Sequence, residues 1–128
     1  MSIPDTKKLI RLSKSCIGEL EKKAVLDVLD IEFLGMGPEV KKFEERLTEF
    51  FKRETLCLSS GTAALHLALQ AVGVKSGDEV LVQSLTYVAS FQAISATGAS
   101  PVACEVDPNT LCIDLIDAEK KLSKNTKV

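Results

Sequence analysis

An alternation of strand and helix patterns that begins near residue 55 constrains the fold of this chain more than any other feature. Short, mostly apolar segments predict strands at 55–60, 79–84 and 101–106. Helical patterns follow these segments at about 61–72, 85–98 and 115–123. The first two of these helices carry almost no charge, so they have no polar face to turn toward water. Such strands and helices are typical of an α/β fold, in which helices cover both sides of a mainly parallel sheet.

The residues before position 55 show a purely helical pattern. Apolar side chains recur at helical spacing over 17–30, with the charges on the opposite side, which predicts an amphipathic surface helix. A second helix is predicted over 38–51, because Pro38 suits the first position of a helix. We therefore expect a helical segment at 1–54 and the first part of an incomplete α/β domain at 55–128.

Composition and charge exclude several kinds of partner. Sixteen basic residues against eighteen acidic residues give a formal charge of -2 with no basic block, so neither nucleic acid nor an anionic membrane is an expected partner. No segment approaches the run of about 18 apolar residues that a membrane span needs, and the N-terminus lacks the apolar region of a signal peptide. We therefore expect a cytoplasmic protein.

The four cysteines and the single histidine do not predict a metal site. The cysteines form no C-x-x-C pair, and we expect all of them to be reduced packing residues: Cys16, Cys57, Cys104 and Cys112. His66 lies within an apolar helical pattern, without the partners that a metal cluster or a Ser/His/Asp triad needs. We expect this side chain to be buried and hydrogen-bonded.

A small polar turn, "SSGT" at 59–62, lies between the first predicted strand and its helix. The first N–H groups of a helix have no partner within the helix and lie at the positive end of its dipole, so they suit a phosphate. Gly61 lets the backbone approach closely, Thr62 adds an N–H and a hydroxyl, and Ala63 adds an N–H without bulk. Ser and Gly are also ordinary capping residues, so the local sequence leaves both interpretations open.

Tyr87 lies in a second turn of this kind, "QSLTYVAS", which ends one predicted strand and opens a helix. The C-terminal ends of parallel strands share one edge of the sheet, so we expect Tyr87 to come near the turn at 61–62. An aromatic platform beside a phosphate seat suits a planar phosphorylated cofactor, although a lone tyrosine is also a common packing residue. The better-known phosphate loops are not indicated, because no Walker A string occurs and "GMGPEV" follows a helix.

Three motifs in this order, "SSGTAALHLAL", "GDEVLVQSLTYVAS" and "GASPVACEVDPNT", closely resemble the sugar aminotransferases of the DegT/DnrJ/EryC1/StrS family. The upstream "FLGMGPEVKKFEE" is similar to that family's N-terminal segment, so the resemblance runs from about Ser13 onward. It implies the N-terminal part of the large domain of a fold-type I pyridoxal phosphate enzyme.

The resemblance also implies residue roles. Gly61, Thr62 and Ala63 would hold the cofactor phosphate, mainly through the amides of the first two and the Thr62 hydroxyl, and Tyr87 would stack on the pyridine ring. The resemblance also implies three residues near the sugar-nucleotide pocket: Leu34, Gly35 and Met36. The alternative interpretation is that these residues only form a turn between two helices.

The chain departs from the family pattern at a few positions. Gln83 stands where proline is usual before the S-x-T motif, and Glu105 stands where aspartate is usual at the end of the third strand. The "FFKRE" segment also lacks the glycine that is common after the second helix. These changes can alter local geometry, but they remove no expected cofactor contact.

The activity implied by the resemblance is the amination of a keto group on a nucleotide-linked deoxysugar, with glutamate as the typical amino donor, in a homodimer. Such products usually enter lipopolysaccharide, O-antigen or related glycans. The family's lysine, which forms a Schiff base with the cofactor, would lie beyond Val128, and no lysine of this chain replaces it, since Lys75 is in a turn and the others read as solvated. We therefore expect a fragment that cannot complete a turnover alone.

Other interpretations stay open: a dehydratase with His at the lysine position, a non-catalytic relative that binds the cofactor, or a plain nucleotide-binding module.

Overall fold

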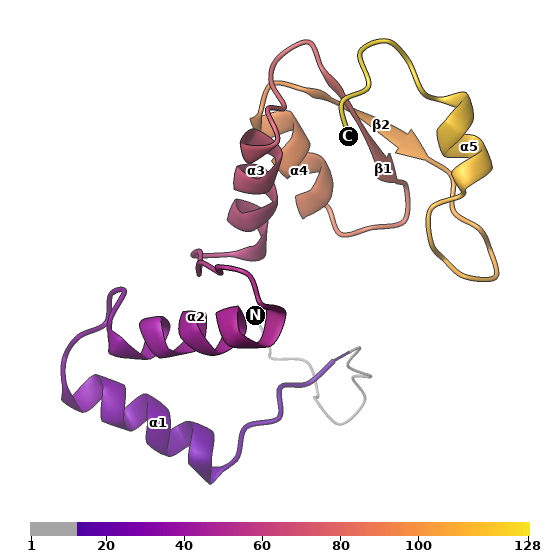
Figure 1. Ribbon diagram of the computed structural model, residues 1–128. Coiled ribbons are helices and arrows are strands. Elements are labelled where there is room, and N and C mark those ends of the chain that lie inside the picture. Colours follow the sequence, from indigo (N-terminus) through magenta and orange to yellow (C-terminus); the bar gives the residue numbers. More distant parts are fainter. Residues whose placement is uncertain (1–12) are drawn as a thin grey trace, which may run out of the picture. The chain divides into compact units, whose positions relative to one another are not determined.

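The computed structural model describes residues 13–128, which divide into two units at Thr55 and Leu56. The first unit contains two helices, α1 (Glu19–Asp30) and α2 (Pro38–Phe51) (Figure 1). Both helices were predicted, and Pro38 occupies the first turn of α2. The bend between them contains Gly37, where an added Cβ would lie 2.5 Å from the Phe33 ring, so a larger residue would force that ring to move.

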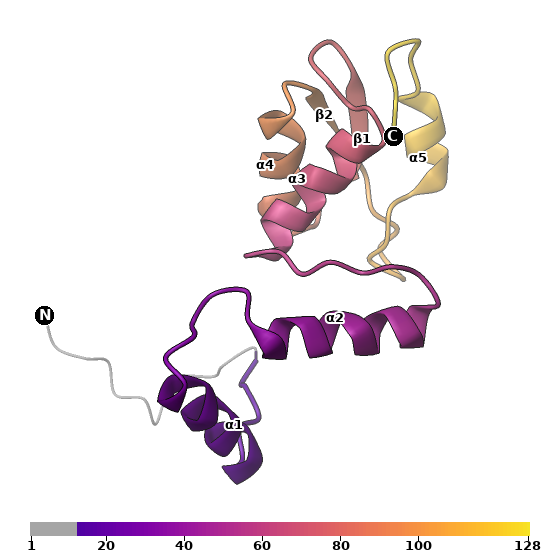
Figure 2. The ribbon, with the colours of Figure 1, turned by 60° about the vertical axis from the view of Figure 1, so that its left-hand side comes forward.

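The second unit is an α/β arrangement with the element order that the sequence predicts from residue 61 onward. It contains α3 (Gly61–Ala71), β1 (Glu79–Gln83), α4 (Ala89–Ala96), β2 (Ser100–Cys104) and α5 (Leu115–Lys120). The strands are parallel and pair from Glu79 with Ser100 to Gln83 with Cys104. In two views of the ribbon, the strands lie between α4 and α5, so helices flank the sheet on both sides (Figures 1 and 2).

Residues 125–128 run alongside the free edge of β1. The N–H groups of Glu79 and Leu81 donate to the carbonyls of Asn125 and Val128, each at 2.8 Å, and the N–H of Lys127 donates to the Glu79 carbonyl at 2.8 Å. The bridge between Glu79 and Thr126 is parallel. This segment therefore continues the sheet in the order 125–128, β1, β2.

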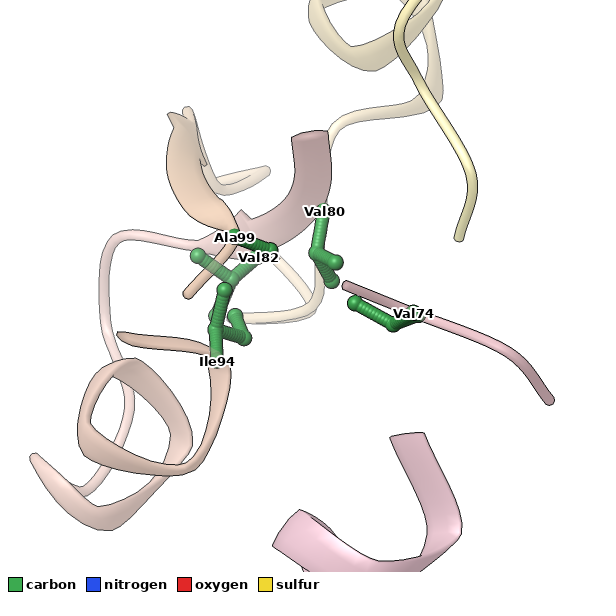
Figure 3. Close-up of a cluster of buried hydrophobic side chains, with 5 residues drawn as sticks. All are labelled: Val74, Val80, Val82, Ile94 and Ala99. Carbon is green, nitrogen blue, oxygen red and sulfur yellow. The ribbon is translucent and has the colours of Figure 1, made fainter. Parts of the chain in front are cut away.

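The core of the second unit lies between the sheet and the helices that precede each strand. Val80 and Val82 alternate along β1 and point to the same face, where they meet Ile94 of α4 (Figure 3). Val74 and Ala99, from the turns that lead into the strands, complete the buried cluster. Alternate residues of a strand share one face, so Val80 and Val82 lie on the side of β1 that α4 covers.

Gly98 ends the turn after α4 in the left-handed region, with φ at 84°, as the sequence predicts for a helix that stops at a glycine. An added Cβ would also approach the backbone of Ser76. The Asp114 side chain caps α5 by accepting from the N–H groups of Ile116 and Asp117.

The predicted strand at 55–60 is wrong, because this segment has no regular secondary structure. A strand exists only through its ladder of hydrogen bonds, and neither described strand pairs with these residues. The side chain of Leu56 is accordingly 80% exposed. The predicted start of the next helix at 85 is also wrong: α4 begins at Ala89, since residues 84–88 form a turn.

Two expectations about side chains need correction. Cys104 is buried and Cys57 is half-buried, but Cys16 and Cys112 are exposed and therefore are not packing residues. His66 is half-buried, and its Nε2 atom is buried without a hydrogen-bond partner among residues 13–128, whereas we expected a hydrogen-bonded side chain. Within the same residues, no helix is long and apolar enough to cross a membrane, and no group of three His, Cys, Asp or Glu side chains is placed to hold a metal ion.

Candidate functional site

The first turn of α3 offers backbone donors to a ligand. The Ser60 hydroxyl caps the helix by accepting from the N–H of Ala63 at 3.2 Å. The N–H groups of Gly61 and Thr62 belong to the same turn and have no acceptor within the helix. Ala63, which was expected to offer its N–H to a phosphate, is therefore already engaged, while Gly61 and Thr62 are the donors that a ligand can reach.

Gly61 borders open space. A Cβ added at this position would meet no atom within 4 Å, and its backbone is not in the left-handed region. Packing within the described chain thus gives no reason for a glycine here. The space that a side chain would fill lies beside the N–H groups of Gly61 and Thr62, so a ligand could approach the backbone closely there.

The turn that carries Tyr87 is held at several points. The N–H of Ser84 donates to the Cys104 carbonyl at 2.8 Å, which adds a rung to the ladder beyond the end of β1. The side chain of Gln83, which replaces the usual proline, donates to the Leu85 carbonyl at 2.5 Å. The Tyr87 carbonyl accepts from the N–H of Ser90 at 3.0 Å. The turn is therefore ordered, although the Tyr87 side chain is 78% exposed.

One depression of about 630 Å³ joins these two turns. Gly61 and Thr62 line it from the start of α3, Tyr87 and Ser90 line it from the start of α4, and small or apolar residues of both helices form the rest of the wall. The structure thus brings together three of the four predicted cofactor residues and leaves Ala63 outside the lining. Sequence analysis missed Ser90, whose hydroxyl lies 3.2 Å from that of Thr86. Ser90 could have been found from its position just after the turn that ends a predicted strand.

The residues expected near a sugar nucleotide lie in the first unit, between α1 and α2. Leu34 and Gly35 line a small cavity of about 130 Å³ in that unit. Met36 does not line it and is exposed.

Sequence analysis also missed the role of Lys121, which was read as a solvated lysine. Its Nζ donates to the Ala103 carbonyl at 2.8 Å and lies 2.8 Å from an Asp117 carboxylate oxygen, and its side chain is only 34% exposed. The hydrogen bond that Lys121 donates to the Asp117 carboxylate raises the pKa of Lys121. The same bond, followed by that from the N–H of Glu105, lowers the pKa of Asp117. The Asp–Lys spacing of four residues on a predicted helix could have revealed this pair.

These pKa shifts also bear on the search for a catalytic lysine. A nucleophilic lysine needs a lowered pKa, so that its amine is neutral near pH 7. Lys121 has the opposite shift, because the carboxylate of Asp117 favours its charged form. Lys121 therefore lacks the lowered pKa that activates a nucleophilic lysine.

The donor set fits a phosphorylated planar group. Two free N–H groups at a helix start, with the Thr62 hydroxyl beside them, suit phosphate oxygens, and an exposed tyrosine at the rim of the same depression offers a flat apolar face. A parallel α/β unit with these groups at the C-terminal edge of its sheet has the layout of proteins that bind phosphorylated cofactors there.

The chain belongs to the DegT/DnrJ/EryC1/StrS aminotransferase family, whose sequence profile matches residues 15–128. It is 38% identical over 109 residues to GDP-perosamine synthase of Vibrio cholerae, which covers 84% of this chain and 30% of that protein. It is 34% identical over 122 residues to dTDP-4-dehydro-2,3,6-trideoxy-D-glucose 4-aminotransferase of Saccharopolyspora spinosa, covering 93% of this chain and 32% of that protein. The chain thus spans about a third of the length of these curated relatives.

Solved structures show the same fold. The Streptococcus pneumoniae protein Spr1654, assigned as a sugar aminotransferase, superimposes in its PLP form with a TM-score of 0.82 and 36% identity, over 91% of this chain and 30% of that one. The E. coli GDP-4-keto-6-deoxy-D-mannose-3-dehydratase with bound hydrated PLP gives a TM-score of 0.79 and 28% identity, over 90% of this chain and 31% of that one. The α/β fold is therefore the one found in the N-terminal part of pyridoxal phosphate enzymes of this type.

Proposed function

We propose that this chain supplies the phosphate seat and ring platform for pyridoxal 5'-phosphate in an enzyme that aminates a keto group on a nucleotide-linked deoxysugar. The observation that carries the proposal is the single depression that joins Gly61, Thr62 and Tyr87. The bound PLP in the solved relatives supports the choice of cofactor. The names of the curated relatives, which act on GDP- and dTDP-linked sugars, support the substrate class.

Each of these residues has a physical task. The N–H groups of Gly61 and Thr62 donate to phosphate oxygens at the positive end of the α3 dipole, and the Thr62 hydroxyl adds a third donor. The Tyr87 ring, at the rim of the depression, would offer a flat apolar face to the pyridine ring of the cofactor. When bound, pyridoxal phosphate supplies the electron sink that lets an amino group pass from a donor to a keto acceptor.

We propose that the catalytic lysine implied by the family resemblance is not among these 128 residues. No lysine on the described elements lines the depression, and the partly buried Lys121 has a raised pKa. We therefore propose that the 128 residues alone do not turn over. The complete enzyme would use glutamate as amino donor, form its active sites in a cytoplasmic homodimer and supply an amino sugar for lipopolysaccharide, O-antigen or a related glycan, as the family resemblance implies.

A second candidate function is sugar dehydration on the same cofactor. It is favoured by the likeness to the E. coli dehydratase, which matches 90% of this chain. The two activities share the phosphate seat described above. The residue at the lysine position of the complete protein decides between them, because only a lysine can link covalently to the cofactor.

The test is the intact mass of the purified protein before and after incubation with pyridoxal phosphate and borohydride, which fixes a lysine-linked cofactor to the chain. We expect one adduct per chain in the intact protein and none on a recombinant chain of residues 1–128. Cofactor that binds but leaves no adduct would favour the dehydratase. An intact protein that takes up no pyridoxal phosphate would refute both functions, and a single stoichiometric adduct on the 128-residue chain would refute the placement of the lysine.

A further inference from the structure

The short helix α5 is fastened to the C-terminal end of β2 through the backbone of that strand. The Nζ of Lys121 donates to the Ala103 carbonyl at 2.8 Å, and the N–H of Glu105 donates to a carboxylate oxygen of Asp117 at 2.7 Å. The Glu105 carbonyl in turn accepts from the N–H of Asp114 at 2.8 Å. Asp117 and Lys121 also form an ion pair with each other at 2.8 Å. We call these two side chains the α5 clamp.

The residue between the clamped positions holds the turn of Tyr87. The Cys104 carbonyl accepts from the N–H of Ser84, which is the last rung between the two strands before the turn begins. Both peptide neighbours of Cys104 are bonded to the α5 clamp, so the direction of its carbonyl is fixed from either side. The position of Ser84 then sets where the chain leaves the sheet toward Tyr87.

We infer that the α5 clamp is a positioning device for the Tyr87 platform: Asp117 and Lys121 hold the end of β2, and through the Cys104 carbonyl they hold the turn at 84–88 that lines the cofactor depression. This inference rests on the proposed function for its consequence in cofactor binding. Its structural part, the hold on the turn, stands on the bonds described here.

The contacts of α5 indicate that the clamp does more than add stability. Leu115 and Ile116 of this helix are exposed, and Ala118 is its only buried residue, so α5 contributes little to the core around Val80. Its strong bonds go instead to backbone groups at the edge of the sheet that faces the depression. Releasing them should therefore loosen the turn while the core between β1 and α4 stays packed.

The charged surroundings of the clamp support its function near neutral pH. Lys120 and Lys121 both favour the ionised form of Asp117, and Asp117 and Glu105 both favour the charged form of Lys121. A charged donor and a charged acceptor give stronger hydrogen bonds to backbone groups than neutral side chains do. The α5 clamp therefore keeps its charge-assisted hydrogen bonds over the pH range in which Asp117 and Lys121 are both ionised.

The experiment uses the intact protein and the variants Asp117→Asn and Lys121→Met, with Lys121→Arg as the conservative variant. Lys120→Met is the matched control, because it removes the same charge from α5 at a neighbouring exposed position. Amide hydrogen exchange of Ser84 in the apoprotein reports the hold on the turn, and titration with pyridoxal phosphate gives the dissociation constant. We expect about tenfold faster exchange at Ser84 and about tenfold weaker binding in the first two variants, with wild-type values in Lys121→Arg and Lys120→Met.

The outcomes separate the inference from the function on which it rests. Unchanged exchange at Ser84, or faster exchange that spreads equally through β1, would overturn the positioning role. Faster exchange at Ser84 with an unchanged dissociation constant would show that the clamp holds the turn but does not position the cofactor, which overturns the inference as stated. A wild-type protein that binds no pyridoxal phosphate would instead overturn the proposed function, while the exchange data would still decide whether the clamp holds the turn.

Discussion

The substitution Gly61→Ala separates the stability of the fold from the affinity of the site. The structure leaves free space around the added methyl group, since nothing lies within 4 Å of it, and the backbone of Gly61 suits an alanine. A glycine replaced by alanine under these conditions stabilises a protein by about 0.4 to 1 kcal/mol, because the unfolded chain loses freedom. We therefore expect the apoprotein to be unchanged or slightly more stable.

The effect on binding should have the opposite sign. The methyl group would occupy the space beside the N–H groups of Gly61 and Thr62, where a phosphate oxygen must come within about 3 Å of the nitrogen. Losing one hydrogen bond to a charged group costs about 1.5 to 3 kcal/mol, which corresponds to a dissociation constant raised about 10- to 100-fold. The assays are thermal unfolding of the apoprotein and titration of each protein with pyridoxal phosphate.

Gly73→Ala is the matched control for this prediction. An added Cβ at Gly73 also meets nothing within 4 Å, but its φ is 82°, a conformation that costs alanine about 1 to 2 kcal/mol. This variant should lose stability and keep its affinity for the cofactor. A Gly61→Ala protein that loses stability by a similar amount would refute the open space at the start of α3, and one that binds with unchanged affinity would refute the phosphate position.

Two further predictions concern the same edge of the sheet. Thr62→Val removes one donor to the phosphate and should weaken pyridoxal phosphate binding about tenfold, whereas Thr62→Ser should bind as the wild type does; equal binding by all three proteins would exclude a role for the hydroxyl. The protection of Ser84 from exchange, corrected for intrinsic rates, should depend on pH through the α5 clamp. The pKa of Asp117 is lowered, so its contribution to this protection is present above the ordinary aspartate range and is lost as the pH falls through the lowered pKa. The pKa of Lys121 is raised, so its contribution is present below the ordinary lysine range and is lost as the pH rises through the raised pKa. Protection that is the same in Asp117→Asn and wild type across this window would contradict the second prediction.

The parts of the fold that local pattern determines were predictable from the sequence. Helix α2 begins at Pro38 as expected, and β1 and β2 appear where apolar segments follow turns. These elements depend on periodicity and on residues with restricted backbone conformations, which neighbouring sequence alone reveals. The parallel pairing followed from the helix between the strands.

The errors have a different physical origin. The segment at 55–60 has the composition of a strand, but a strand needs a partner, and no local pattern reports whether one is present. Lys121 looked like a surface lysine because the carbonyl to which it donates, that of Ala103, lies on a strand 18 residues earlier in the chain, although its spacing from Asp117 indicated an ion pair. The exposed Cys112 lies in a hairpin turn, a position that its apolar character did not predict.

The location of the candidate site was predictable for a reason that does not depend on any single residue. A helix that precedes a parallel strand starts at the edge where that strand ends, so the start of α3 and the turn after β1 lie at one edge of the sheet although no strand precedes α3. The expectation that Gly61 and Tyr87 would lie close together relied on a strand at 55–60 that the structure does not have, but both residues line one depression. The bonds that hold the turn could not be predicted in this way. Gln83 and the α5 clamp bind backbone carbonyl groups, and the sequence does not show which carbonyl a side chain will reach. The start of α3 and the turn of Tyr87 thus meet at one depression, and the bonds of Gln83 and of the α5 clamp with the backbone bear only on the second of them.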